Sequence, residues 1–209
     1  MYHIHGINIS SNTTKTVYVA EELGIEYQYT NMDLSRGEHK TAEHMARHPL
    51  GKVPTLTHNG EYLFESGAIC CYLASTESSE LYPVRDHLER CRVDQWMDFF
   101  ANHLGRWLNT YAFEKVAKVK YGFGVPNKAV EDEALGFINQ QMPAVEAHLG
   151  SREFLLGDKL TIADHFAFAY MEMAELGLLS LDDYPNLSNW YQSFKMRQSI
   201  SRAKVRMGL

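Results

Sequence analysis

The chain lacks several features that mark common classes of protein. Its three cysteines form neither a CxxC pair nor an even disulfide framework. Its ten histidines show no HExxH or comparable spacing, so no metal site is predicted. No Lys/Arg block stands out against a formal net charge of -6, which argues against nucleic acid or an anionic membrane as a partner. The cysteines, Cys70, Cys71 and Cys91, are therefore expected to be small buried apolar residues.

Long apolar segments are also absent from the sequence. No run approaches the roughly 18 residues that a membrane-spanning helix needs. The N-terminus lacks the basic and then apolar pattern of a signal peptide, so a cytoplasmic location is expected. What the chain does have is a 45% hydrophobic content, which is enough for a sizeable core.

The first third of the chain mixes short strands and helices. Asn59-Gly60 between two apolar segments predicts a tight hairpin, because its turn needs positive φ at both central positions. A right-handed crossover should make the first two strands parallel, and the hairpin should add an antiparallel pair. Strands are expected at residues 2–7, 26–32, 55–58 and 61–64, and helices at 14–23, 41–48 and 66–74.

The remainder reads as helical after a polar linker at residues 76–83. Thr161 and Asp164 have the spacing of a capping box, which is a structural role. We expect domains at residues 1–78 and 86–209, with helices at 86–120, 127–149, 161–176 and 185–198.

Pro54 and Val53 are the first candidates for a binding site. A cis bond before Pro54 would turn the N–H and C=O of Val53 outward, where a bound peptide could pair with them as an added strand. Base rates favour an ordinary trans edge proline, but the surrounding residues favour the cis form here.

Glu65 and Ser66 are the second candidates, where a strand runs into a helix. Free N–H groups and the helix dipole favour an anion at this position. Ser66 could bind a ligand carboxylate while Glu65 binds a neighbouring ammonium group. Taken alone, the pair reads more simply as a helix cap, Ser66, beside a solvated acid.

Ser10, Ser11 and Asn12 lie in the turn between the first strand and the first helix. A hydroxyl here can face a ligand at the helix N-terminus, or it can merely cap the helix. Lys15 either reaches this site or lies on a solvated face.

Taken together, these motifs resemble those of the cytosolic glutathione transferase superfamily, in particular its serine-type, bacterial-like members. The resemblance extends over nearly the whole chain. Each motif alone is a weak signal, but the occurrence of all of them in the family's order is specific. The motifs are Ile4-His5-Gly6 through Ser10-Ser11-Asn12 and Lys15, then Gly37 to Lys40, Pro49 to Pro54, Phe64 to Ile69, and Gly157 to Asp164.

The resemblance implies a thioredoxin-like N-terminal domain of order βαβαββα, an all-helical C-terminal domain and a homodimer. It also implies site roles for glutathione as co-substrate. Glu65 and Ser66 would hold the γ-glutamyl end of glutathione. Val53 would pair with the cysteinyl backbone. Lys52 and His39 would bind the glycyl carboxylate. Ser10 matches the hydroxyl that donates to the sulfur, and Asn12 is a further candidate donor.

The sequence departs from the family pattern in three ways. Gly67 follows Ser66 where some relatives have a side chain that helps to bind the ligand. Ser11 stands where a proline often follows the catalytic serine, so Ser10 and Ser11 could exchange roles. The turn has no tyrosine or cysteine, which argues against the tyrosine-type and cysteine-type branches.

The implied activity is attack of an activated glutathione thiolate on a small apolar electrophile. The helical part has a stripe of aromatic residues, which is interpreted first as part of the buried core. Some of these residues could instead line an apolar cleft or form a dimer contact. Substrate-contacting candidates are His103, Trp107, Tyr111 and Phe113. Alternatives are a glutathione-dependent disulfide or peroxide reductase, or a non-catalytic binding module on the same fold.

Overall fold

The computed structural model describes residues 1–77 and 79–209, which form two compact units. The first unit combines Met1–Val84 with Lys195–Leu209, and the second is Arg85–Phe194. The predicted domain end at residue 78 lies outside the described residues. The C-terminal segment, which was predicted with the helical domain, is grouped with the first unit.

A four-stranded mixed sheet forms the centre of the first unit. The strands β1 (Tyr2–Gly6), β2 (Tyr27–Asn31), β3 (Thr55–His58) and β4 (Glu61–Phe64) lie in the order β2-β1-β3-β4. β1 pairs in parallel with β2 and antiparallel with β3, and β3 pairs antiparallel with β4. The predicted crossover and hairpin are confirmed.

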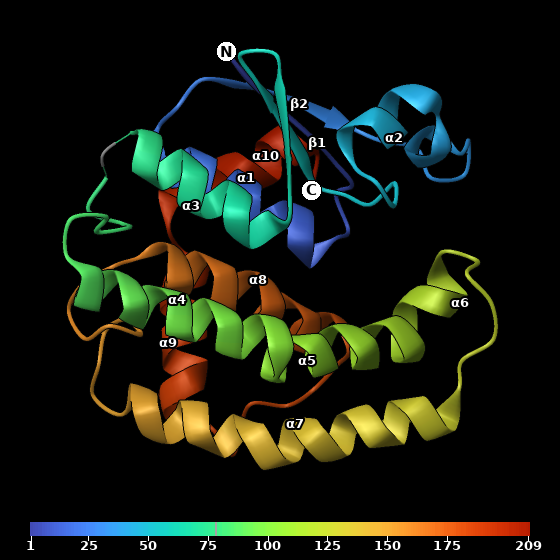
Figure 1. Cartoon of the computed structure of the whole chain (residues 1–209). Coiled ribbons are helices and arrows are strands. Elements are labelled where there is room, and N and C mark those ends of the chain that lie inside the picture. The colour runs from blue at the N-terminus through green and yellow to red at the C-terminus, as the bar shows by residue number, and fades with distance from the viewer. Residues whose placement is uncertain (78) are drawn as a thin grey trace. The chain divides into compact units, whose positions relative to one another are not determined.

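Helices α1 (Ser11–Leu23) and α3 (Ser66–Thr76) pack against each other beside this sheet (Figure 1). Between β2 and β3 the chain forms a 3₁₀ turn (Glu38–Lys40) and the short helix α2 (Ala42–Arg47). The core between α1, α3 and the strands is fully buried and apolar, including Ile4, Val17, Leu56, Ile69 and Leu73.

Two sequence-based expectations, on the start of α1 and on the three cysteines, need correction. α1 begins three residues earlier than predicted, because the carbonyl of Ser10 already accepts from the N–H groups of Thr13 and Thr14 at 2.9 Å each. Residues such as serine and threonine have a low helix propensity, which hides this start in the sequence. Burial holds for Cys70 but not for Cys91, which is exposed, and Cys71 is half-buried.

Helix α10 (Gln198–Met207) packs against α1, and the prediction missed it. The side chain of Glu21 on α1 accepts hydrogen bonds from Tyr27 Oη at 2.8 Å, Arg202 Nε at 3.1 Å and Arg206 Nε at 2.7 Å. Next to it, Glu22 accepts from Arg197 Nη2 at 2.7 Å. These ion pairs attach the C-terminal segment to the helix that begins at Ser11.

The helical unit contains α4 (His87–Asn102), α5 (Leu104–Ala112), α7 (Lys128–Leu149), α8 (Ile162–Leu176) and α9 (Pro185–Lys195). A π-helical turn (Phe113–Ala117) and the short α6 (Lys118–Lys120) extend α5. The predicted single helix at 86–120 is therefore wrong. His103, with φ -119° and ψ -105°, ends α4 and precedes α5.

Two residues after His103, helices α5 and α8 approach each other closely. A Cβ atom on Gly105 would lie 2.5 Å from Cγ of Tyr170, so only glycine lets α5 pack this closely against α8. Elsewhere in the unit the ring of Trp96 on α4 lies 4.2 Å from that of His148 on α7, measured between centroids.

Helix α8 is buried along most of its length and begins with the predicted capping box. Asp164 Oδ2 accepts from the N–H of Thr161 at 3.0 Å and from its hydroxyl at 3.1 Å, and Oδ1 accepts from the N–H of Leu155 at 2.8 Å. A buried carboxylate needs such donors, because an unpaired buried charge costs several kcal/mol.

Glu21→Gln should lower the free energy of unfolding at pH 7 by about 1–2 kcal/mol, because it removes the charge that two half-exposed arginines pair with. Burial raises the pKa of Glu21, but hydrogen bonds from Arg206, Tyr27 and Arg202 bring it below its ordinary value of 4.5 overall. The stabilisation is therefore present above pH 4.5 and is lost as the pH falls through the lower folded-state pKa.

Urea denaturation between pH 7 and pH 3 measures this difference. Glu26→Gln is the matched control, because Glu26 is exposed and lies next to β2 without an ion pair among the described residues. Equal effects of the two substitutions at pH 7 would contradict a stabilising role for Glu21.

Thr161→Ala should cost about 1 kcal/mol, because it removes one donor to the buried carboxylate of Asp164. The half-buried Thr110, whose hydroxyl donates only to the carbonyl of Arg106 at 3.0 Å, serves as a control within the same unit. Thermal melts of both alanine variants test the difference, and no loss for Thr161→Ala would disprove the role of the capping box.

Candidate active site

The turn from β1 into α1 places three polar residues at the N-terminus of a helix. Thr13 Oγ1 accepts from the N–H of Ile7 at 3.2 Å, which closes the turn. Its methyl group would lie 2.2 Å from a Cβ on Gly6, so glycine is required where the chain leaves β1. Ser10 is half-buried and its side chain does not cap the helix. Its hydroxyl therefore remains available for a ligand.

The next residues of α1 turn inward. Ser11 is buried, Asn12 is half-buried and Lys15 is fully buried. Lys15 Nζ donates to Asn12 Oδ1 at 3.0 Å. Burial lowers the pKa of Lys15 to about 7, against smaller opposing effects of Cys70 and Glu65. Of the two interpretations of Lys15 from sequence, the solvated face is wrong.

The loop before β3 has the predicted cis bond between Val53 and Pro54. His44 Nε2 lies 2.8 Å from the carbonyl oxygen of Lys52 and holds the loop from α2. Among the described residues, the backbone N–H and C=O of Val53 have no hydrogen-bond partner in the protein. An extended ligand backbone can pair with such groups.

The start of α3 has an unusual backbone conformation. Glu65 is the N-cap residue and has φ 67°, one of three non-glycine residues with positive φ in the described chain. Such a conformation costs about 1–3 kcal/mol and is typical of ligand sites. Ser66 is the first helical residue, and no side chain caps the helix, so the prediction of Ser66 as the cap is wrong. The N–H groups of the first turn remain able to bind an anion.

Two observations bring the starts of α1 and α3 together. Cys70 Sγ lies 3.7 Å from the carbonyl oxygen of Lys15, and these residues are each one helical turn beyond Ser66 and Ser11. Glu65 is also near enough to Lys15 to influence its pKa.

His39 and Lys52, the residues predicted to meet the glycyl carboxylate, belong to the 3₁₀ turn and to the loop before β3. The carbonyl oxygen of His39 would lie 2.4 Å from a Cβ on Gly51, which has φ 61°, so the 3₁₀ turn and the loop are in direct contact. Nδ1 of His39 is buried without a hydrogen-bond partner. Lys52 is exposed. His44, which supports the loop, was not predicted, since a single histidine in a short helix has no sequence signal.

The four predicted substrate-contacting residues in the helical unit have different surroundings. His103 is exposed between α4 and α5, whereas Tyr111 is buried next to Gly177. Trp107 stacks on Phe137 of α7 with ring centroids 4.3 Å apart. Phe113 is 40% exposed and belongs to a separate aromatic group.

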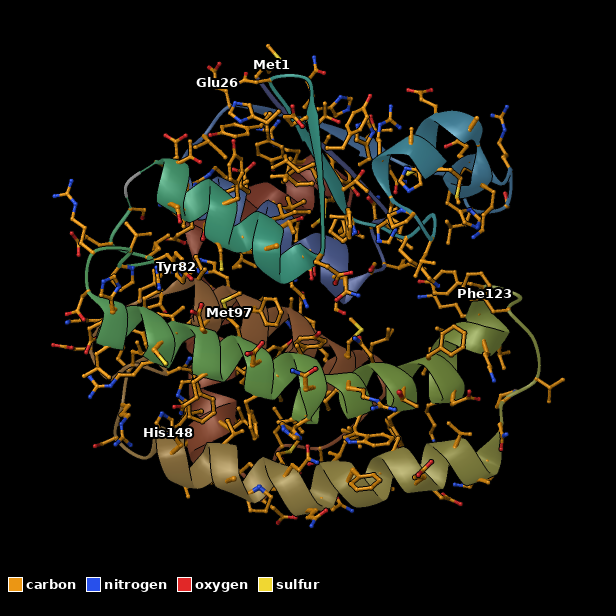
Figure 2. The ribbon with its side chains drawn as sticks, in the orientation of Figure 1. Met1, Glu26, Tyr82, Met97, Phe123 and His148 are labelled. Atoms are coloured by element: carbon orange, nitrogen blue, oxygen red, sulfur yellow. The ribbon has the colours of Figure 1, made fainter. Side chains whose placement is uncertain are left out.

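That group, the exposed aromatic cluster, consists of Phe113, Tyr121 and Phe123. The ring of Phe123 lies 6.0 Å from Phe113 and 6.2 Å from Tyr121. Phe123 is seen in the segment just after α6 (Figure 2). Sequence reasoning missed Tyr121 and Phe123 because the neighbouring Gly122 and Gly124 read only as helix breakers.

Comparison with known proteins identifies the family of the chain. Residues 2–75 match the model of the glutathione S-transferase N-terminal domain, and residues 110–197 match that of the C-terminal domain. None of the described helices is long and apolar enough to cross a membrane.

Relatives and solved structures agree with these matches over nearly the full length. A rice protein named a probable glutathione S-transferase is 33% identical, covering 95% of this chain and 94% of its own. Glutathione S-transferase 1 of maize is 32% identical over 98% and 96% of the two chains. A glutathione S-transferase-I structure bound with lactoylglutathione has a TM-score of 0.88 and 30% identity, covering 99% of both chains. The chain therefore belongs to the glutathione S-transferase family.

Proposed function

We propose that this chain is a glutathione transferase that activates the glutathione thiolate for attack on small electrophiles. The observation that carries the proposal is the convergence of two uncapped helix starts, Ser10-Ser11 and Glu65-Ser66, within one unit. Thr55 pairs with Phe64, so the unpaired backbone of Val53, two residues before Thr55, comes close to the start of α3. Together they offer anion-binding groups and a strand edge, which suit a short peptide with two carboxylates and a thiol.

Each part of glutathione has a proposed partner. The ammonium group of the γ-glutamyl end binds Glu65. The carboxylate of the same end binds Ser66 and the N–H groups at the start of α3. The cysteinyl backbone pairs with Val53, next to Pro54 and Ser11. The glycyl carboxylate meets Lys52 and His39, whose buried Nδ1 lacks a partner in the protein.

The chemistry requires the thiol to ionise near neutral pH. The thiolate is the nucleophile, and a free thiol has a pKa of about 8.5. Lowering this by about two units requires roughly 2.7 kcal/mol of preferential stabilisation of the anion. One hydrogen bond to a charged group supplies about 1.5–3 kcal/mol, so Ser10 together with the N-terminus of α1 is sufficient.

The electrophile requires apolar surface, which the helical unit offers. Of the four residues named from sequence, His103 and Phe113 are exposed, and Phe113 is the apolar one and belongs to the exposed aromatic cluster. A solved relative from maize is described in complex with an atrazine glutathione conjugate, has a TM-score of 0.85 and is 30% identical. A homodimer remains a prediction from the resemblance, and a cytoplasmic location remains a prediction from the N-terminal sequence.

Ser66→Ala should weaken glutathione binding about tenfold while leaving stability nearly unchanged. Since Ser66 makes no capping hydrogen bond, the usual cost of about 1 kcal/mol for losing a cap does not apply. Ser75→Ala on the same helix is the control. Calorimetric titration with glutathione and a thermal melt measure the two effects. A loss of stability without a loss of affinity would show that Ser66 has a purely structural role.

The bound glutathione thiol should titrate about two units below the free thiol, and Ser10→Ala should raise its pKa by about one to two units. The thiolate absorbs in the ultraviolet, so a pH titration of the complex measures both values. An unshifted thiol in the wild type contradicts the proposal. A shift that survives in Ser10→Ala assigns the sulfur contact to Ser11 or Asn12.

The same variants separate conjugation from reduction. A glutathione-dependent reductase would exchange disulfides faster than it conjugates electrophiles, with Asn12→Ala more damaging than Ser10→Ala. We expect the opposite order, because the hydroxyl of Ser10 lies at the N-cap position of α1 without capping the helix.

A further inference from the structure

Lys15 is a buried lysine whose role the proposed function does not use. Its relative exposure is 0%, and its Nζ lies 3.0 Å from Oδ1 of Asn12. Burying an amine costs free energy unless the group is well hydrogen-bonded. A role in the candidate active site therefore explains a lysine at this position better than core packing does.

The contact with Lys15 determines which way the carboxamide of Asn12 faces. The oxygen of a carboxamide only accepts hydrogen bonds and its nitrogen only donates, and Lys15 Nζ is the donor to Oδ1 of Asn12. The oxygen of Asn12 therefore faces Lys15, and the NH₂ group faces away. Among the described residues, this NH₂ group has no hydrogen-bond partner, and the side chain is half-buried at the second position of α1.

The direction of the carboxamide matters for an anion at the N-terminus of α1. A thiolate accepts hydrogen bonds, so an NH₂ group stabilises it, whereas a carboxamide oxygen in the same place repels it. A free asparagine side chain can present either group. Lys15 removes this freedom by occupying the oxygen.

We infer that Lys15 is a positioning residue that holds Asn12 with its NH₂ group available to donate a hydrogen bond to the glutathione sulfur. This rests on the proposed function and adds a second donor to Ser10. It assigns Lys15 an action through Asn12 and no contact with the substrate.

The groups around Lys15 are compatible with this role. Cys70 on α3 is its nearest sulfur neighbour, and burial raises the pKa of that thiol far above neutral, so it stays uncharged. Glu65, at the start of α3, is the carboxylate whose charge acts on Lys15.

A double-mutant cycle with Lys15→Met and Asn12→Ala tests the inference, with the pKa of the bound thiol at saturating glutathione as the readout. Methionine keeps most of the buried volume and cannot donate. Each single variant should raise the thiol pKa by about one unit. In the Asn12→Ala background, Lys15→Met should produce no further rise, because no carboxamide remains to be positioned.

Other outcomes have separate meanings. If the charge of Lys15 stabilised the thiolate directly, its effect would persist in the Asn12→Ala background, and additive shifts would overturn the inference. An unchanged thiol pKa in Lys15→Met would overturn it too, while the proposed function would stand. An unshifted thiol in the wild type would remove both.

Two further variants guard against a purely structural explanation. Cys70→Ala loosens the packing beside Lys15 without touching the carboxamide, so it should lower the melting temperature and leave the thiol pKa unchanged. Asn12→Asp replaces the NH₂ group by a carboxylate oxygen and decides the question if Lys15→Met does not fold. Its thiol pKa should rise more than that of Asn12→Ala, and an unchanged value would contradict the inference.

Discussion

The packing of α1 is the constraint on which the rest of the first unit depends. This helix contacts α3 along one side and α10 along another, and residues 13–21 are all buried. A helix held so completely cannot shift along its axis without breaking close contacts. Its first turn therefore has a defined position, and so do Ser10, Ser11 and Asn12 at its N-terminus.

The site consists largely of backbone groups and helix ends, with few side chains of strong intrinsic chemistry. The uncapped N–H groups at the starts of α1 and α3 and the unpaired backbone of Val53 are the groups on which the proposed binding mainly depends. Such groups need no reorganisation when an anion arrives, because the fold already orients them. The positive φ of Glu65 is the local cost of this arrangement.

The helical unit is organised by close approaches between its helices. Gly105 allows α5 to contact Tyr170, and the backbone of His103 separates α4 from α5. As a result, the aromatic residues of this unit face different neighbours. Trp107 packs on α7, while Phe113 begins a π-helical turn and belongs to the exposed aromatic cluster. Such turns are frequently found at functional sites.

The sequence by itself determined the strands, the hairpin at Asn59-Gly60, the cis bond before Pro54 and the two-part order of a thioredoxin-like and a helical region. The strands and the hairpin follow from local rules, since turn chemistry and hydrophobic periodicity act between near neighbours in the chain, whereas the thioredoxin-like fold was implied by the family resemblance. The ordered motifs likewise led to the residues that are proposed to bind glutathione, because each motif lies within a few residues of a strand or helix end.

Only the tertiary structure decided the features that depend on contacts between distant segments. Lys15 is equally compatible with a solvated face until α3 covers it, and α10 has no visible role until its arginines meet Glu21. The position of Gly105 against Tyr170 is another contact between residues far apart in the chain. Burial and pairing between such residues are properties of the packed chain, and no local pattern encodes them.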